Sequence, residues 1–132
     1  MKKICYLFVL AIMPMCFIAC GGDDDGPTGQ DALIIGSWER IKYESYNTKG
    51  EKEYETRESR IDTYYVDGTC QHGTKDRKFQ WKIDGSKLII TDNGSSEVYI
   101  IQTLDKSDMI LHFDYSDGRY FIEKYRKITG NQ

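Results

Sequence analysis

The sequence lacks the short motifs that carry common enzyme chemistry. It contains no glycine-rich loop for phosphate, no His-Glu pair spaced for a metal-binding helix and no serine in a nucleophile-elbow setting. Cys70 and His72 would share one strand face and could begin a metal site, but His112 is the only other histidine and zinc normally takes three or four protein ligands. We therefore expect a protein that is not an enzyme and that binds no metal or cofactor.

Cysteine is scarce beyond the N-terminus. Three of the four cysteines, Cys5, Cys16 and Cys20, lie close to the N-terminus, so Cys70 has no disulfide partner in the rest of the chain. An unpaired cysteine most commonly serves as a small buried hydrophobe. Cys70 and His72 would share one face of a strand about 6–7 Å apart, which is too far for the histidine to activate the thiol.

An excess of positive charge is also missing. The chain has 18 lysines and arginines against 21 aspartates and glutamates, which gives a net charge of −3. Nucleic-acid binding and attraction to anionic lipid both require a basic surface, so we expect neither. The run 51–60 alternates in sign, which is typical of a solvated hairpin face and, as an alternative, of a docking surface for a partner.

No hydrophobic run reaches the roughly 20 residues that a membrane-spanning helix needs. The apolar stretch 4–18 follows two lysines and runs into Phe17–Cys20, a sequence that resembles a bacterial lipobox. The resemblance implies a signal peptide over residues 1–19, cleavage before Cys20 and acyl chains on the sulfur of that cysteine. Several acyl chains would hold the protein durably on a membrane.

Residues 20–31 form a short linker rich in glycine and aspartate. Its triplet Asp23–Asp25 follows the cysteine closely and resembles the acidic export signal of Bacteroidetes lipoproteins. That resemblance implies an outer-membrane lipoprotein exposed on the cell surface. As an alternative, a stretch of this composition is simply a flexible, solvated tether.

From residue 32 to residue 132 the sequence predicts one all-β domain. Four dipeptides, Asp67-Gly68, Asp84-Gly85, Asn93-Gly94 and Asp117-Gly118, tolerate positive φ and suit two-residue hairpin turns. No long stretch has the period of an amphipathic helix, and only residues 31–36 suggest a helical turn. The runs between turns predict strands at Ser37–Tyr46, Lys52–Thr56, Ile61–Val66, Thr69–Gly73, Lys78–Ile83, Lys87–Thr91, Glu97–Leu104, Met109–Tyr115 and Arg119–Lys127.

Alternation of apolar and polar residues is clearest in two of these strands. The apolar members of each would share one face: Phe79, Trp81 and Ile83 in one strand, and Met109, Leu111 and Phe113 in the other. Many short strands joined by tight turns predict an antiparallel up-and-down barrel of eight or nine strands, or else a sandwich. We favour the barrel because closure removes sheet edges and no long crossover is present.

The tripeptide Gly36-Ser37-Trp38 opens the first predicted strand after the helical turn, and it resembles the lipocalin signature. The resemblance implies an eight-stranded barrel in which Trp38 packs across the closed end against a basic residue of the last strand. Arg126 is the first candidate for that basic residue, and Arg119 and Lys127 are the alternatives. The contact would be a cation–π interaction.

Three later segments, Gly68-Thr69, Trp81–Leu88 and Leu104–Met109, are similar to the lipocalin-like domain lipoproteins of Bacteroidetes. Their order along the chain extends the resemblance over about residues 34–128.

The family resemblance implies binding of a small, partly apolar molecule. Tyrosine is frequent in the predicted strands, and we take Tyr64, Trp81 and Tyr99 as candidate ligand contacts. An eight-stranded barrel encloses one small ligand at most, so a barrel filled by its own side chains is the alternative. Such a filled barrel would act as a surface interaction module for a protein or a glycan.

Overall fold

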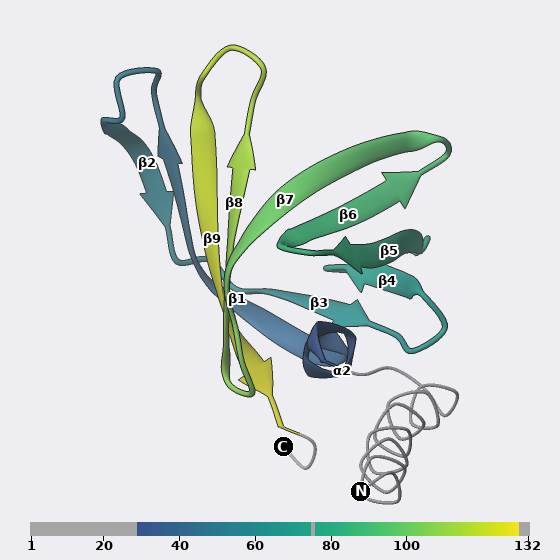
Figure 1. The fold of residues 1–132 in the computed structure, drawn as a ribbon. Coiled ribbons are helices and arrows are strands. Elements are labelled where there is room, and N and C mark those ends of the chain that lie inside the picture. Colours follow the sequence, from purple (N-terminus) through teal and green to yellow (C-terminus); the bar gives the residue numbers. More distant parts are fainter. Residues whose placement is uncertain (1–28, 75, 130–132) are drawn as a thin grey trace, which may run out of the picture.

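The computed structural model describes residues 29–74 and 76–129, and it is an all-β fold with one short helix (Figure 1). The predicted signal peptide, Cys20 and most of the predicted linker lie outside these residues. The elements are α2 (Gln30–Ile34), β1 (Gly36–Tyr46), β2 (Lys52–Thr56), β3 (Arg60–Tyr64), β4 (Thr69–His72), β5 (Phe79–Asp84), β6 (Lys87–Asp92), β7 (Ser95–Leu104), β8 (Asp108–Asp114) and β9 (Tyr120–Ile128). Each predicted strand is present, with ends within two residues of the prediction.

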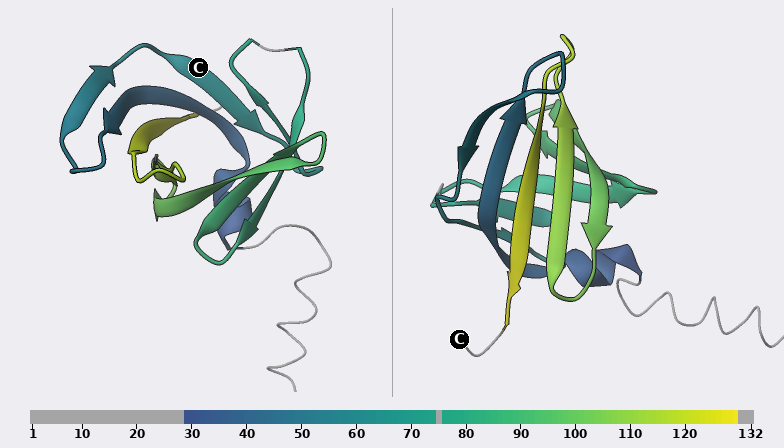
Figure 2. Two further views of the ribbon diagram at one scale, coloured as in Figure 1. Left: turned by 90° about the horizontal axis from the view of Figure 1, so that it is seen from above. Right: turned by 90° about the vertical axis from the view of Figure 1, so that its left-hand side faces the viewer.

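The strands close into a barrel. Strands β3 to β9 follow one another in sequence order, every pairing is antiparallel, and β9 returns to pair with β1 along nearly its whole length. This gives an eight-stranded closed barrel plus one extra strand, β2 (Figure 2). The predicted up-and-down barrel is therefore confirmed, and the sandwich is excluded.

The extra strand β2 and strand β3 pair with different parts of the same edge of β1. Residues 36–40 of β1 pair with β3 and residues 43–46 pair with β2, so both strands run along the same edge of β1. A register shift between Arg40 and Lys42 interrupts the pairing of β1 with β9. Such a bulge changes which side chains point inward, so Trp38 and Arg40 face the interior before it and Tyr43 faces the interior after it.

Local turn chemistry explains the tight connections. Asn93 and Gly94 both have positive φ, 53° and 86°, as a type I′ turn between β6 and β7 requires. The twist of this turn type matches the right-handed twist of the two strands that it joins. The dipeptide therefore fixes the register of the β6–β7 hairpin from the sequence alone.

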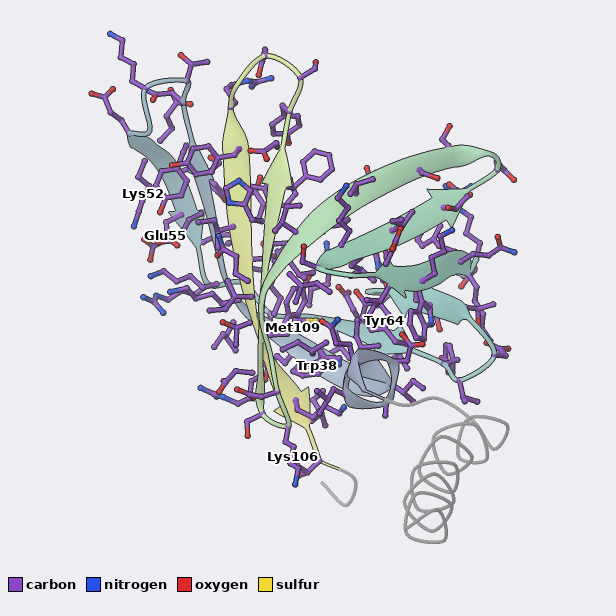
Figure 3. The ribbon with its side chains drawn as sticks, viewed as in Figure 1. Trp38, Lys52, Glu55, Tyr64, Lys106 and Met109 are labelled. Carbon is purple, nitrogen blue, oxygen red and sulfur yellow. The ribbon has the colours of Figure 1, made fainter. Side chains whose placement is uncertain are left out.

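The end of the barrel beside α2 is closed and filled. Ile34, Trp38, Tyr64, Leu88 and Met109 belong to one buried cluster there (Figure 3). The Trp38 indole Nε1 donates a hydrogen bond of 2.9 Å to the carbonyl of Ile34, the last residue of α2.

In the two described stretches, no helix is both long and apolar enough to span a bilayer.

The predicted alternation is confirmed. Phe79 is buried and both Trp81 and Ile83 pack against the core. Met109 and Leu111 are buried in the same cluster. The polar neighbours on β5, Gln80 and Lys82, are exposed.

Candidate functional site

Lys127, and not Arg126, is the basic partner of Trp38. The Lys127 ammonium lies 4.6 Å from the centroid of the Trp38 ring and donates to the carbonyls of Leu33, at 2.9 Å, and Ile35, at 2.7 Å. Tyr125 points inward, so strand alternation sends Arg126 out to solvent, where it is exposed, and returns Lys127 to the interior. Burial lowers the pKa of Lys127.

Glycine at position 36 makes room for this lysine. Gly36 has a φ of 126°, which strongly favours glycine, and a Cβ placed there would lie 2.9 Å from Cε of Lys127. The Gly-x-Trp motif thus has a physical basis in this chain. The missing side chain at Gly36 leaves space for Lys127, and the Lys127 ammonium packs on the Trp38 ring. Arg119, the other alternative, pairs with Asp117 at 2.8 Å in the β8–β9 turn.

The three candidate ligand contacts lie in different parts of the barrel. Tyr64 is 2% exposed inside the filled end. Trp81 is half-buried, meets the Tyr64 ring edge-on at 6.0 Å and donates through Nε1 to the Tyr65 carbonyl at 3.0 Å. Both side chains therefore support the closed end. Tyr99 lies further along the interior, where its hydroxyl donates to Glu97 at 3.0 Å, so it is the one of the three that stays a candidate for ligand contact.

A buried polar network crosses the middle of the barrel. Arg60 makes a two-pronged contact with Asp62, with Nε to Oδ1 at 2.9 Å and Nη2 to Oδ2 at 2.7 Å. The Tyr125 hydroxyl receives a hydrogen bond from Arg60 and lies 3.1 Å from both Asp62 and Glu123. Arg40 completes the network with an ion pair of 2.9 Å to Glu123. The two arginines and the two carboxylates of this network carry charges that sum to zero.

Electrostatics keeps two members of the network, Tyr125 and Arg60, protonated. Burial raises the pKa of Tyr125 well above its usual value, and the charges of Glu123 and Asp62 raise it further, so its hydroxyl stays protonated. Burial opposes the charge on Arg60, but hydrogen bonds to Asp62 and the nearby acids outweigh that effect and raise its pKa. We name this network the polar floor because it separates the filled end from the open end.

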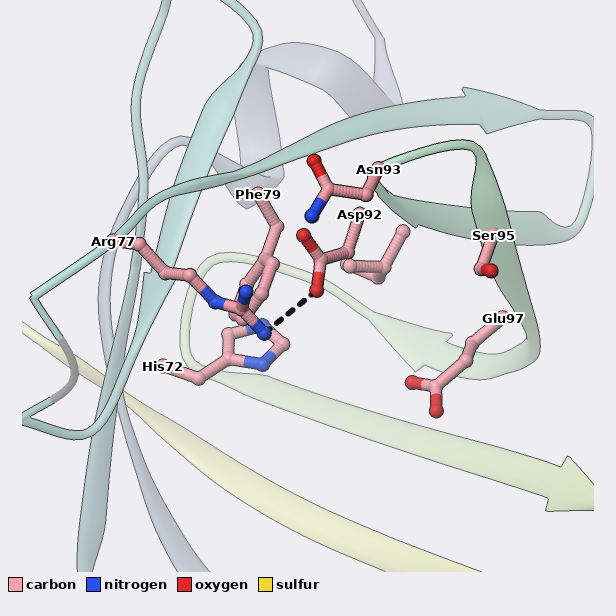
Figure 4. Close-up of a pocket in the computed structure, with 8 residues that line it drawn as sticks. His72, Arg77, Phe79, Asp92, Asn93, Ser95 and Glu97 are labelled. Atoms are coloured by element: carbon pink, nitrogen blue, oxygen red, sulfur yellow. Dashed lines mark ion pairs between the residues drawn. The ribbon is translucent and has the colours of Figure 1, made fainter.

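The open end of the barrel, away from α2, holds a pocket of about 460 Å³ (Figure 4). Its side chains come from the ends of β4 to β7 and from the β4–β5 loop. The lining residues are His72, Arg77, Phe79, Ile90, Asp92, Asn93, Ser95 and Glu97. Arg77 and Asp92 form an ion pair of 2.8 Å at the pocket. We name this hollow the mouth pocket.

A second hollow of about 520 Å³ adjoins the mouth pocket beside β3 and β4. His72 lines both hollows. Arg60, a member of the polar floor, lines the second hollow. The two hollows therefore share a boundary at His72.

The interior surface of β7, β8, β9 and β1 is aromatic near the mouth. Successive ring centroids are 5.1 Å apart from Tyr99 to Phe113, from Phe113 to Phe121 and from Phe121 to Tyr43. Tyr115 packs on Phe113 at 5.3 Å. We call these five residues the aromatic wall. It joins the mouth pocket through the hydrogen bond from Tyr99 to Glu97.

The geometry around Cys70 fits a structural role. Cys70 is fully buried, and its Sγ lies 3.9 Å from Nε2 of His72, within hydrogen-bond distance for sulfur. The expectation that strand spacing keeps the two groups too far apart is therefore wrong, because the side chains lean toward each other on their shared face. Burial, with a smaller contribution from Asp62, raises the pKa of the Cys70 thiol to about 12, so the thiolate nucleophile does not form at neutral pH. Among the described residues, no three His, Cys, Asp or Glu side chains gather in a way that could hold a metal ion.

Sequence reasoning missed the polar floor and most of the mouth pocket. Arg60, which lines the interior, falls at the end of the alternating run 51–60 that the sequence predicts to be a solvated face, and that prediction is wrong for this residue. The available signal was the strand pattern itself. Arg60, Asp62 and Tyr64 alternate on β3, so the polar pair had to share the face of a buried tyrosine.

The chain is similar to a known protein family and to a solved structure. A family model described as a lipocalin-like domain matches residues 34–111. A bovine odorant binding protein, studied as a deswapped triple mutant, is 17% identical in sequence over 76% of this chain and 77% of its own, with a TM-score of 0.39. Among curated proteins, none matches this sequence.

Proposed function

The chain belongs to the lipocalin-like domain family, and from that premise we propose that it binds a small, partly apolar molecule at the open end of its barrel. The observation that carries the proposal is the mouth pocket, where Phe79 and Ile90 lie among charged and polar groups and Glu97 connects to the aromatic wall through its hydrogen bond with Tyr99. The mouth pocket itself is lined mainly by polar side chains, so the apolar area that a small-molecule site needs would come from Phe79, Ile90 and the neighbouring aromatic wall.

The depth of the site follows from the polar floor. Asp62 is 0% exposed and held by Arg60, so a ligand cannot enter the filled end without breaking a buried ion pair. The pocket volume of about 460 Å³ lies within the range of roughly 300–1,000 Å³ found for small-molecule pockets. The ligand would therefore be small and would lie near the mouth, with one side against the aromatic wall.

Native mass spectrometry of the full-length protein, incubated with an apolar extract of its host's culture medium, tests this proposal. We expect an adduct of discrete mass on the wild-type protein. Ser95 lines the mouth pocket and is exposed, so Ser95→Trp should fill the pocket without disturbing the core, and it should lower the adduct signal about tenfold or more.

The neighbouring residue supplies the matched control. The Ser96 hydroxyl lies 2.9 Å from Thr91 Oγ1 on the other face of the strand pair, so Ser96→Trp should leave the adduct unchanged. A wild-type protein that stays bare with every extract would contradict ligand binding. It would favour the alternative, a surface module for a protein or a glycan.

We further propose that the barrel is tethered to the outer membrane by acyl chains on Cys20 and is displayed on the cell surface. The lipobox at Phe17–Cys20 and the triplet Asp23–Asp25 support this part of the proposal. The tether would hold the mouth pocket outside the cytoplasm, within reach of molecules in the surrounding medium.

Loss of the acylated sulfur should release the protein from the membrane. Metabolic labelling with an alkyne fatty acid should mark the wild-type protein and the Cys16→Ala control, and should fail to mark Cys20→Ala. Replacing Asp23, Asp24 and Asp25 by alanine should protect the barrel from protease added to whole cells. A labelled Cys20→Ala protein would refute the tether, and unchanged surface cleavage would reduce the acidic triplet to a linker.

A further inference from the structure

Among the described residues, no lysine or arginine lies within ion-pair distance of the Glu97 carboxylate, which lines the mouth pocket. Arg77 already pairs with Asp92 at 2.8 Å. Glu97 accepts a hydrogen bond from the Tyr99 hydroxyl at 3.0 Å, and no lysine or arginine nitrogen of the described residues lies within ion-pair distance of it. Figure 4 shows the Glu97 carboxylate apart from the Arg77–Asp92 pair. Within residues 29–74 and 76–129, Glu97 therefore presents the mouth pocket with a carboxylate that is in no ion pair.

The pairing of β7 with β6 positions Glu97. Glu97 lies on β7, where its backbone is in register with Ile90 of β6. Burial raises the pKa of Tyr99 and the charge of Glu97 raises it further, so the phenol stays protonated and keeps donating to the carboxylate. Because one carboxylate oxygen accepts this hydrogen bond, the other oxygen remains to receive a donor from a ligand.

Aromatic rings lie next to this carboxylate. The ring of Tyr99 contacts Phe113 at 5.1 Å and Phe121 at 6.2 Å. The face of an aromatic ring attracts a cation, and it also offers apolar area to the body of a ligand. A carboxylate beside aromatic rings is the chemistry that recognises an ammonium group on an apolar molecule.

The other charges near the mouth do not favour an anion. The two arginines of the polar floor are balanced by Asp62 and Glu123. An anionic ligand would have to approach Glu97 and Asp92 with no free guanidinium among the described residues to receive it. A carboxylate or phosphate head is therefore disfavoured relative to an amine.

We propose that the ligand is a small monocationic amine with an aromatic or apolar body, whose ammonium group pairs with Glu97 and whose body lies against the aromatic wall. This inference rests on the proposed function, because it names the chemical class of the molecule that the mouth pocket binds. Glu97 would set the preference for a positive charge on the ligand. The aromatic wall would supply contact area to the ligand body whatever the charge of its head group.

Isothermal titration calorimetry of the full-length protein with three matched probes tests the proposal. The probes are 2-phenylethylamine, 2-phenylethanol and 3-phenylpropionate, which share a phenyl body and differ in the charge of the head group. We expect the amine to bind about tenfold more tightly than the alcohol, and the carboxylate to bind more weakly than either. Glu97→Gln should lower the amine affinity to that of the alcohol and leave the alcohol unchanged.

A second variant separates local charge from net charge. Glu53→Gln on β2 removes one exposed carboxylate that lies outside the mouth pocket, so the preference for the amine should persist. Equal affinities for the three probes, or an unchanged preference in Glu97→Gln, would overturn the inference. If none of the probes binds while native mass spectrometry still captures a ligand, the inference is wrong and the proposed function stands. If neither experiment detects a ligand, both fall.

Discussion

Replacing Asp62 by alanine is expected to lower the free energy of unfolding by about 3–5 kcal/mol. Asp62 is 0% exposed and accepts hydrogen bonds from Arg60, from the Tyr125 hydroxyl and from the backbone amide of Gly73, at 3.2 Å. Removing the carboxylate leaves the Arg60 guanidinium, which is about one-third exposed, without its closest anion. Urea denaturation followed by tryptophan fluorescence measures the loss.

Two further variants show whether the ion pair itself causes the effect. Asp84→Ala, at an exposed position of β5, should change stability by no more than about 0.5 kcal/mol. The double variant Arg60→Met with Asp62→Leu removes both charges, and it should recover most of the loss because no unpaired charge stays buried. A loss below about 1 kcal/mol in Asp62→Ala would contradict the buried polar floor.

The polar floor explains why this barrel has a shallow site. In the filled half, apolar side chains such as Leu88 and Met109 occupy the interior. Above it, charged groups take inward positions that could have continued the apolar core. Most of their polar atoms pair with one another, which offsets the cost of burying them, and they set the depth to which an apolar ligand can enter.

Strand positions could be predicted from this sequence because each depends on residues close together in the chain. The Asn93-Gly94 turn and the alternation in Phe79–Ile83 each act over a few residues, and both agree with the structure. Barrel closure could be predicted too, since a meander of short strands has few other ways to hide its edges. The extra strand β2 also follows from a local signal, the turn before Lys52.

The site could not be predicted in the same way because it combines distant strands. The mouth pocket takes residues from four strands, one loop and one turn. The choice of Lys127 over Arg126 depends on a register that only the closed barrel fixes. The bulge at Arg40–Lys42 reverses the side-chain alternation in the rest of β1. Simple alternation counted from Trp38 would therefore place Tyr43 on the outer face, whereas Tyr43 points inward. Tyr99 and Tyr64 look alike in sequence, yet one lies near the mouth and the other in the filled end.

Replacing Trp38 by alanine is expected to lower the free energy of unfolding by about 3–5 kcal/mol, since it removes a large, fully buried side chain from the closed end. The change also deletes the hydrogen bond to the Ile34 carbonyl and the ring beneath Lys127, so α2 loses one of its attachments. Thermal unfolding by circular dichroism measures the loss.

The contribution of the cation can be separated from that of the ring. Lys127→Met keeps the aliphatic contact but removes the charge above Trp38, a cation–π interaction worth about 0.5–2 kcal/mol, and it leaves the Leu33 and Ile35 carbonyls without this donor. Arg126→Met, one residue earlier on the exposed face of β9, should cost no more than about 0.5 kcal/mol. If Arg126→Met were the more damaging of the two, the pairing of Trp38 with Lys127 would be wrong, and the closed end would depend on the residue that the sequence first suggested.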